Sequence, residues 1–502
     1  MRRPPLPVLL SLALLLLLTD SASGALFTRG PSLWKVTTNS ILIAWQTDTP
    51  SSGKVLYSTH PGAWTAAADT ATGTEHSVTL HGLQPATQYD YRVVIDDVLL
   101  TTHLRFRTAP SGVTPFRFVA FGDCGVADAN QYAVAARVDS LNPDLGLILG
   151  DVIYEAGEAA NFTPRYFTPY ASIINHAVFY PVVGNHDIIT GGGQPFLDAF
   201  YLPTNSKDGS EKYYSFDYAN VHFVALDGND YFNADMYDWV EADLAATTKR
   251  WNIVYFHQPM YTEPSTHTSD LNLRFYLEPI FVYHHVDLVL QGHNHNYCRS
   301  YPIRNGTAVD TAQGSSYHNP GGVIYLVAGG GGRVLYPFTG HDPLIRSAFS
   351  VFHTVAVDVA GDSMYVQAVL PNGTVFDCFS IVKRASTAVE ASGHETFVGS
   401  VQATAGGPVL LSVRKPKPNP NPFQRSAELS FTLPRASQVH LTIRDVHGRM
   451  LRELVSAELQ AGEHSARWDG KDDRGRNAAT GVYFATLDVG GTVVKTRLAL
   501  LR

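Results

Sequence analysis

At residues 116–125 the chain reads FRFVAFGDCG, a largely apolar run that ends in glycine and aspartate. Four later segments repeat this pattern, and most of them carry glycine just before the polar residues. They are LGLILGDVIY (145–154), FYPVVGNHD (179–187), WNIVYFH (251–257) and VDLVLQGHNH (286–295). Apolar runs of this length are typical of strands buried on both faces, with helices covering the sheet. Their alternation with helix-like segments predicts an α/β domain.

The polar residues that follow these runs form a candidate metal site. In such sheets ligands bind beyond the carboxyl ends of the strands, so the five runs are expected to bring their side chains to one rim. The candidate metal ligands are Asp123, Asp151, Tyr154, Asn185, His257, His293 and His295. Nitrogen and oxygen donors without a thiolate suit iron, manganese or zinc rather than a structural zinc site. Seven ligands are too many for one ion, so two ions that share one carboxylate are expected. Each motif alone is compatible with a simple turn, but five in chain order, each at a strand end, favour a common metal site.

The order of the motifs carries a family resemblance. They read Asp-x-Gly, Gly-Asp-x-x-Tyr, Gly-Asn-His, Val-x-x-His and Gly-His-x-His, and this series resembles the metallophosphoesterases, in particular the purple acid phosphatases. Tyr154 is the discriminating residue, because relatives that use two Mn or Zn ions lack a tyrosine there. The resemblance covers about residues 27–384. It implies a catalytic domain at 115–384, an α/β core built as a two-sheet β-sandwich flanked by helices.

The resemblance also implies roles for the candidate residues. It assigns Asp123, Tyr154 and His295 to an Fe(III) site. It assigns Asn185, His257 and His293 to a divalent site for Zn, Mn or Fe(II), with Asp151 bridging the two. The implied activity is that of a secreted acid phosphatase, which hydrolyses phosphate monoesters with a metal-bound hydroxide as nucleophile. His186 is the first candidate for the acid that protonates the leaving group, and His267, in the loop 260–270, is the second; the other interpretation of His267 is a surface-loop histidine.

Two other functions stay open as hypotheses. A phosphodiesterase or nucleotide pyrophosphatase on the same dinuclear core is the alternative enzyme, because substrate choice lies in loops such as 187–212 and 259–272. The non-enzymatic alternative is an adhesion module with an inactive core, which the complete set of ligands disfavours.

Several conspicuous features are predicted to be structural. Asp187 is expected to cap a turn rather than act as a base. The glycines 329–332 lack the Lys-Ser/Thr of a phosphate-binding P-loop and predict a close-approach turn near the metal rim. The pair His284-His285 is expected at a helix end. Residues 233–247 predict a helix with Asn233 as its N-cap. Its mostly apolar face holds Met236, Trp239, Val240, Asp243 and Leu244.

The segments on either side of the catalytic domain read as β-structure. Residues 26–110 resemble a fibronectin type III domain, because Ile41, Ile43 and Trp45 alternate and Tyr89 has the setting of a tyrosine corner. Residues 385–422 are expected to be a linker that ends in a stiff Lys-Pro and Asn-Pro stretch. Residues 423–502 resemble the Ig-like C-terminal domains that follow an Asn-Pro-Phe motif, here 421–423, in exported bacterial proteins. The resemblance implies sorting for type IX secretion or surface attachment; the alternative is a plain spacer.

The N-terminus and the composition agree with an exported protein. Residues 1–25 read as a signal peptide, with Arg2, Arg3 and an apolar core of 9–18. The mature protein is therefore expected to be secreted or at the cell surface, without a transmembrane segment. The formal charge of −8 and the absence of a basic run exclude a nucleic-acid footprint. The expected partners are a phosphorylated small molecule and, through the C-terminal domain, the secretion machinery.

The three cysteines are too few for a disulfide framework. Cys124 is expected to be a buried free thiol, although its place beside Asp123 would let a thiolate compete for metal. Cys298 and Cys378 both lie in the catalytic domain, and spacing alone leaves open whether they form a disulfide.

Overall fold

The computed structural model describes residues 24–59, 62–69, 71–311, 315–383, 417–419, 423, 425–433, 435–445, 449–479, 481–489 and 492–500. All but the last two residues of the expected signal peptide lie outside this part of the chain, as do most of the expected linker and Asn421 and Pro422. The chain divides into two compact units at Arg384 and Ala385. None of the helices in the described ranges has both the length and the hydrophobicity needed to cross a membrane.

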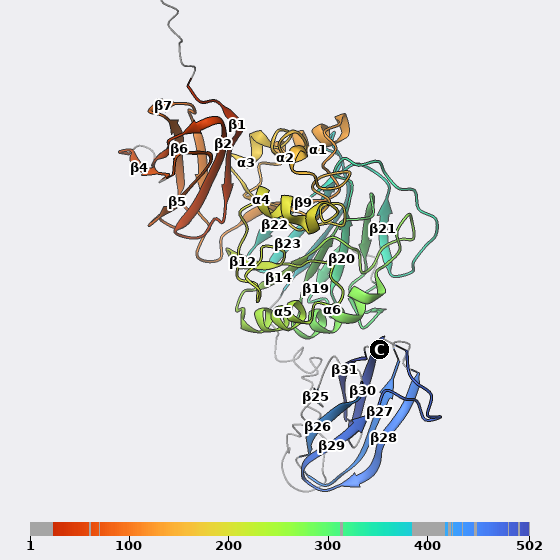
Figure 1. Ribbon diagram of the computed structural model, residues 1–502. Coiled ribbons are helices and arrows are strands. Elements are labelled where there is room, and N and C mark those ends of the chain that lie inside the picture. The colour runs from red at the N-terminus through yellow and green to blue at the C-terminus, as the bar shows by residue number, and fades with distance from the viewer. Residues whose placement is uncertain are drawn as a thin grey trace, which may run out of the picture. The chain divides into compact units, whose positions relative to one another are not determined.

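The first unit opens with an all-β sandwich (Figure 1). One sheet has the order β1-β2-β5, and the other the order β4-β3-β6-β7 with β8 on β6. The strands are β1 (Phe27–Trp34), β2 (Ser40–Ser51), β3 (Gly53–Ser58), β4 (Thr65–Ala68), β5 (Gly73–His81), β6 (Gln88–Ile95), β7 (Val98–Leu99) and β8 (Leu104–Arg107). Ile41, Ile43 and Trp45 are buried, as their alternation predicts. The backbone N–H of Gln84 donates to the Tyr89 hydroxyl at 2.9 Å, which confirms the tyrosine corner.

This sandwich packs directly against the α/β domain that carries the candidate metal ligands. The indole of Trp34 lies 5.6 Å from the ring of Phe200, measured between centroids, and 6.4 Å from that of Phe167. The Tyr91 hydroxyl donates to the carbonyl of Asn175 at 2.7 Å. The N-terminal sandwich therefore supports the helical segment that follows the second ligand-bearing strand.

The α/β domain is built on two seven-stranded mixed sheets, which confirms the expected two-sheet core. The first has the order β11-β10-β9-β22-β23-β24-β19, and the second β12-β13-β14-β15-β20-β16-β21. Phe118 of β9 and Phe223 of β13 meet edge to face, with centroids 5.3 Å apart, so the two sheets share a core.

The strands that precede the sequence motifs fall where the apolar runs predict them. They are β9 (Phe116–Phe121), β10 (Leu145–Ile148), β11 (Val178–Pro181), β14 (Trp251–Tyr255) and β15 (Leu288–Gln291). β9, β10 and β11 pair in parallel in the first sheet, and β14 pairs in parallel with β15 in the second. The rim expected from the sequence is thus shared between two sheets rather than built on one.

The remaining strands complete these sheets and add one short hairpin, β17-β18. They are β12 (Tyr214–Tyr218), β13 (Val221–Ala225), β16 (Tyr297–Ser300), β17 (Ile303–Arg304), β18 (Thr307–Ala308), β19 (Ser316–His318), β20 (Ile324–Ala328), β21 (Ile345–Phe349), β22 (Thr354–Ala360), β23 (Ser363–Val369) and β24 (Val375–Val382).

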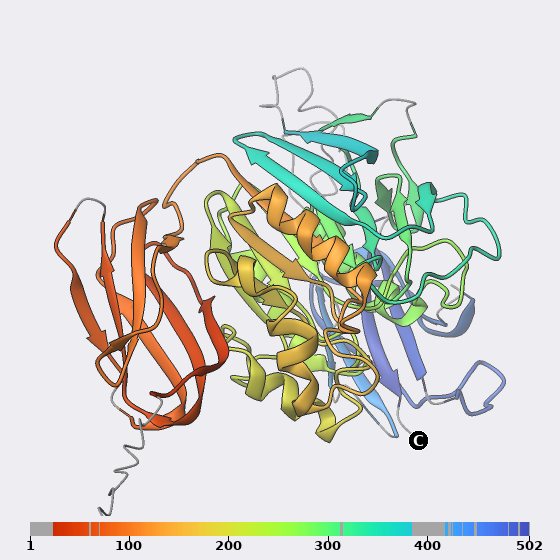
Figure 2. The ribbon, with the colours of Figure 1, turned by 90° about the horizontal axis from the view of Figure 1, so that it is seen from above.

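Helices flank the two sheets. Figure 1 shows α1 to α3 on one side of the sheets and α5 and α6 on the other, and Figure 2, seen from above, shows the long helix α1 lying over the strands. The helices are α1 (Ala129–Leu141), α2 (Ala159–Phe162), η1 (Thr163–Phe167), α3 (Ala171–Ile174), η2 (Gly191–Gly193), α4 (Gln194–Ala199), α5 (Ala234–Ala246) and α6 (Leu271–Tyr283).

Two predictions about these helices are confirmed and one detail is corrected. The Asn233 side chain accepts a hydrogen bond from the N–H of Met236, so it is the N-cap of α5. His284 is the C-cap of α6, at the helix end where it was expected. Trp239 is only half-buried: its ring packs edge to face on Tyr213 with centroids 5.2 Å apart, and its indole N–H donates to the carbonyl of Asn205.

All three cysteines are free thiols. Cys124 is buried, as predicted, and burial raises the pKa of its thiol far above the usual value. Cys298 lies on β16 and Cys378 on β24, strands of different sheets. The disulfide that the sequence left open is therefore not formed.

The second unit is a separate all-β domain with its own core. Its sheets have the orders β25-β26-β29 and β28-β27-β30-β31. The strands are β25 (Lys417–Asn419), β26 (Ala427–Leu433), β27 (Ser437–Arg444), β28 (Met450–Leu459), β29 (Gly462–Trp468), β30 (Gly481–Val489) and β31 (Thr492–Leu500). Val439, Leu441 and Ile443 are fully buried, which confirms their predicted alternation, and Phe423 packs on Trp468.

Candidate metal centre

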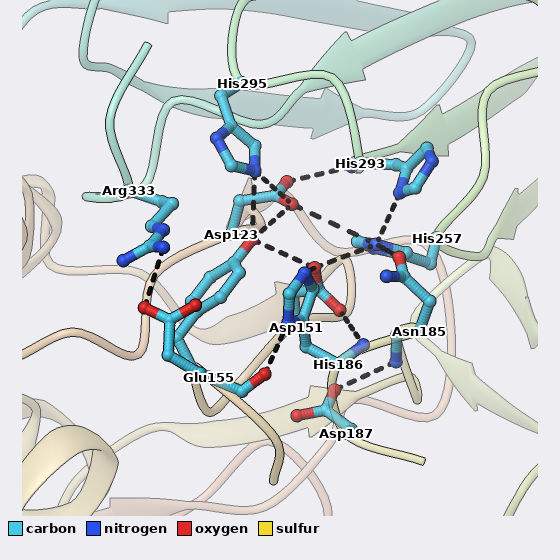
Figure 3. A network of polar contacts seen from close by, with 12 residues as sticks. Asp123, Asp151, Glu155, Asn185, His186, Asp187, His257, His293, His295 and Arg333 are labelled. Atoms are coloured by element: carbon cyan, nitrogen blue, oxygen red, sulfur yellow. Dashed lines mark hydrogen bonds and ion pairs between the residues drawn. The ribbon is translucent and has the colours of Figure 1, made fainter. Parts of the chain in front are cut away.

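Five loops at the carboxyl ends of the strands meet at one place. The loop after β9 carries Asp123, and the loop after β10 carries Asp151 and Tyr154. The loops after β11, β14 and β15 carry Asn185, His257, and the pair His293 and His295. The structure brings all seven predicted ligands into one connected network of polar contacts (Figure 3).

Asp151 lies at the middle of this network. Its Oδ2 is 2.9 Å from the Tyr154 hydroxyl and 3.3 Å from His257 Nε2. Asp123, Asp151 and His257 are all buried, and one potential ligand atom from each lies within 4.8 Å of the others. Asp151 therefore touches a residue expected at each ion, which is the position that a bridging carboxylate needs.

One group of donors gathers around the phenol. The Tyr154 hydroxyl is 3.1 Å from Asp123 Oδ1 and 3.0 Å from His295 Nε2. A second group gathers around His257, whose Nε2 is 3.1 Å from Asn185 Oδ1 and 3.2 Å from His293 Nδ1. The two groups match the two sets of ligands that the sequence predicts.

Backbone carbonyls orient two of the imidazoles. His257 donates its Nδ1–H to the carbonyl of Leu149 at 2.7 Å, and His295 donates its Nδ1–H to that of Val334 at 2.7 Å. In each case, when the imidazole is neutral, this bond leaves its Nε2 without a proton and directed at the centre, which is the tautomer that a metal ligand requires.

Three of the seven residues have left-handed backbones: φ is 60° at Asp123, 49° at Asp151 and 68° at His293. Residues other than glycine adopt this region rarely, and such strain concentrates at functional sites. Close packing helps to impose it. A Cβ at Gly184 would collide with Asp151, and one at Gly329 would lie 2.7 Å from Asp123 Oδ2. The glycines 329–332 thus form the close-approach turn that the sequence predicts.

Two buried carboxylates, Asp123 and Asp151, dominate the electrostatics of the site. Burial and the charges of Asp123 and Asp151 raise the pKa of Tyr154 well above its usual value. Burial and the neighbouring His257 lower the pKa of His293 to about 2. For Asp151 burial opposes ionisation, but the charges of His257 and His186 outweigh it and lower the pKa of the carboxyl. A trivalent cation at the phenol would reverse the shift of Tyr154 and hold it as phenolate.

The donor chemistry fits the expected pair of ions. The group around Tyr154 supplies anionic oxygens, which suit a hard ion such as Fe(III), and the group around His257 supplies two imidazoles and an amide, which suit a softer divalent ion.

Buried Asp187 is not one of these donors, because its carboxylate accepts backbone N–H bonds from Val152, Ile153 and Gly184. It caps the turn, as predicted.

The two candidate acids flank the donors on the solvent side. His186 donates Nδ1–H to the carbonyl of Glu155 at 2.6 Å, and its Nε2 is 4.0 Å from Asp151 Oδ2. His267 stacks on His293 with ring centroids 3.9 Å apart. The loop position of His267, which the sequence placed only loosely, is therefore next to the candidate centre.

Four residues of this site were missed by the sequence analysis. Asn294 holds the loop of His267, and Tyr336 stacks on His295 with centroids 4.0 Å apart. Arg333 and Glu155 form an ion pair of 2.7 Å beside Tyr154. For Arg333 the sequence offered one signal of a place in the site, because this residue directly follows the glycine turn that was predicted to approach the metal rim.

Comparisons with known proteins agree with this site. Residues 116–297 match the calcineurin-like phosphoesterase family, residues 31–108 the purple acid phosphatase N-terminal domain and residues 420–492 the FlgD Ig-like domain. An uncharacterized protein of Mycobacterium tuberculosis is 28% identical over 338 residues, which cover 54% of this chain and 64% of that protein. Purple acid phosphatase 23 of Arabidopsis thaliana is 27% identical over 303 residues, which cover 52% of this chain and 63% of that protein.

A solved structure shares the fold. The structure of purple acid phosphatase PPD1 from yellow lupin aligns with a TM-score of 0.64 at 19% identity, covering 72% of this chain and 76% of that one. The chain thus has the fold of a purple acid phosphatase. In sequence it is similar to the purple acid phosphatases over its N-terminal sandwich and its α/β domain, and the segment 420–492 that matches the FlgD Ig-like domain is additional. The chain spans a little under two thirds of the length of these two curated relatives.

Proposed function

We propose that the chain is a secreted acid phosphatase that hydrolyses phosphate monoesters. The observation that carries this proposal is the convergence of two carboxylates, a phenol, an amide and three imidazoles from five loops. The purple acid phosphatases among the relatives support the reaction class.

The same residues would hold the two ions. Asp123, Tyr154 and His295 are the proposed ligands of Fe(III), and Asn185, His257 and His293 those of Zn, Mn or Fe(II). Asp151 is proposed to bridge them, because it contacts both groups. When bound, such a pair would supply Lewis acidity and an activated water.

The chain's own part in the reaction is to move a proton and to position the ester. The carbonyl of Glu155 takes the Nδ1–H of His186, so Nε2 is the nitrogen that can carry a proton to the leaving alkoxide. His267, which stacks on His293, is the second candidate for the acid that protonates the leaving group. His186 and His267 are both half-buried, so an ester can reach them.

A comparison of two chromogenic esters tests the proposed substrate class. Purified protein should hydrolyse p-nitrophenyl phosphate faster than bis(p-nitrophenyl) phosphate. Faster turnover of the bis-ester would favour the phosphodiesterase alternative, and no turnover of either ester after metals are restored would contradict both enzymes.

Metal analysis and colour test the proposed ions. The protein should contain iron with a second metal and be pink to purple, and Tyr154→Phe should remove the colour. Tyr365→Phe is the matched control, because Tyr365 is an exposed residue of β23. A colourless, active protein with two Zn or two Mn ions would contradict the Fe(III)–phenolate assignment while leaving the phosphoesterase proposal intact.

Export and sorting form a separate part of the proposal. The apolar N-terminal segment supports export, and the match of residues 420–492 to an Ig-like family supports attachment or sorting. A chain that ends at residue 422 should keep its phosphatase activity but lose its surface or secreted location in cell fractionation. An unchanged location would leave the second unit as a spacer.

A further inference from the structure

The loop 329–336 wraps the candidate metal centre on the side of the phenol. The N–H of Gly331 donates to the carbonyl of Gly122 at 3.0 Å, and that of Arg333 to the carbonyl of Asp123 at 3.0 Å. Further along, the N–H of Tyr336 donates to the carbonyl of His295 at 3.0 Å. The backbone of Arg333 is therefore attached to the loops that carry two of the candidate ligands.

The side chain of Arg333 lies at the open edge of this site. Its guanidinium carbon is 4.8 Å from the centroid of the Tyr154 ring, and Figure 3 shows it on the side of the site where His295 lies. The side chain is 30% exposed, close to the 31% of His186, whereas those of Asp123 and Asp151 are 0% and 2% exposed. A fixed positive charge thus lies beside the donors, within reach of solvent.

The partner of Arg333 in the free protein is replaceable. Its Nη2 is 2.7 Å from Glu155 Oε1, but the Glu155 side chain is 62% exposed. An ion pair in such a solvated setting favours its closed form by about fivefold at most. Phosphate offers a guanidinium two parallel charge-assisted hydrogen bonds, which are stronger.

We propose that Arg333 binds the terminal oxygens of a dianionic phosphate monoester and that Glu155 competes for it when the site is free. This inference rests on the proposed function and deepens it, because it names the feature of the substrate that the site selects. A monoester dianion has three terminal oxygens, so one remains for Arg333 after two face the proposed ions. A diester has only two terminal oxygens and one negative charge, so Arg333 contributes less to binding it.

The contact of Arg333 with the Tyr154 ring lets the guanidinium stay in place when its ion pair with Glu155 opens. The guanidinium lies over the ring, where a cation is attracted to the π-electrons. The same side chain therefore has two attachments in the free protein, of which only the ion pair with Glu155 must open for phosphate. Arg333 can turn its N–H groups to the substrate without leaving the ring.

Kinetics of single variants test the proposal on the metal-loaded full chain. Arg333→Ala should raise the KM for p-nitrophenyl phosphate about tenfold with a smaller change in kcat, and the KM for bis(p-nitrophenyl) phosphate less than about threefold. Arg333→Lys should show an intermediate KM, because lysine keeps the charge without the planar fork. Glu155→Gln should lower the KM for the monoester about two- to fivefold. Arg304→Ala removes an exposed arginine of β17 and should change neither.

Calorimetric titration with inorganic phosphate gives a readout that does not need turnover. Arg333→Ala should weaken phosphate binding about tenfold, and Glu155→Gln should strengthen it. Unchanged phosphate affinity and unchanged monoester KM in Arg333→Ala would overturn the proposal, and so would equal losses for the two esters. If Arg333→Ala misfolds, Glu155→Gln decides alone, because weaker or unchanged phosphate binding in that variant contradicts competition. Wild-type protein that hydrolyses neither ester would refute the proposed function, and the phosphate titration would still decide the role of Arg333.

Discussion

Asn294 holds the backbone of His267 at both of its polar groups: its Oδ1 accepts the N–H of His267 at 3.2 Å, and its Nδ2 donates to the carbonyl of His267 at 3.1 Å. The same amide accepts from the Ser265 hydroxyl at 2.7 Å and donates to that of Thr262 at 3.0 Å. Asn294 is fully buried and lies between the candidate ligands His293 and His295. The loop of His267 is therefore tied to the same strand end as two imidazoles of the site.

Replacing Asn294 should release His267 without removing a metal ligand. We expect Asn294→Ala to lower kcat/KM for p-nitrophenyl phosphate about tenfold or more, because a misplaced catalytic group loses its alignment. The double variant with His267→Ala should lose little more than His267→Ala alone, since both act through one group. Metal content by mass spectrometry is the control. Additive losses, or loss of metal in Asn294→Ala, would contradict a positioning role.

Gly150 allows the close approach of His257. Its φ is +83°, and a Cβ there would lie 2.5 Å from His257 Nδ1, the atom that donates to Leu149. Gly150→Ala should displace the imidazole and lower kcat/KM by about a hundredfold, with reduced metal content. Gly30→Ala is the matched control, because a Cβ at Gly30 meets nothing within 4 Å. Normal metal content and activity in Gly150→Ala would show that the loop tolerates the methyl group.

His222 predicts a loss of stability at alkaline pH. Its Nδ1 is 2.8 Å from Asp217 and its Nε2 is 2.8 Å from Asp243, so it joins β12, β13 and α5. Burial opposes the charged ring, but the two carboxylates win and raise the pKa to about 9. Because this pKa lies above the unfolded value of about 6.5, the stabilisation is complete below pH ~6.5 and is lost as pH rises through 9.

The size of this effect follows from the difference between the two pKa values. It amounts to about 3 kcal/mol of the free energy of unfolding. Urea unfolding from pH 6 to pH 10 should show the loss in wild-type protein and in His81→Gln, an exposed control on β5. His222→Gln should be less stable at pH 6 and should lose less on the alkaline side. A parallel pH dependence in all three proteins would refute the assignment.

The state of the cysteines predicts a simple thiol count. Burial raises the pKa of Cys298 to about 12 and that of Cys124 further, whereas Cys378 is half-buried. A disulfide-exchange reagent should therefore label one thiol rapidly in native protein and all three after denaturation without reductant. Cys378→Ser should remove the rapid phase. One thiol after denaturation would reveal a disulfide instead.

Much of the fold and of the candidate site follows from local pattern. The apolar runs predict the strands β9 and β14, and Asn233 predicts the N-terminal end of α5. The alternation at Val439 and Leu441 predicts the core of the C-terminal domain. These features depend on the burial period of a strand or helix and on side chains near its ends, which neighbouring residues in the chain already specify. Trp239 is the exception on α5: it is only half-buried, and its partners Asn205 and Tyr213 lie outside the helix, where the helical pattern does not record them.

The sequence by itself determined which residues stand at the ends of buried strands, and hence the candidate donors Asp123, Asp151 and His257. Only the tertiary structure decided that two sheets share the rim and that Arg333, Glu155 and Asn294 surround it. The reason is physical. A hydrophobic pattern records whether a residue is buried, whereas the contact of Asp123 with the N–H of His293, 170 residues away in the chain, depends on strand order and register across the whole core.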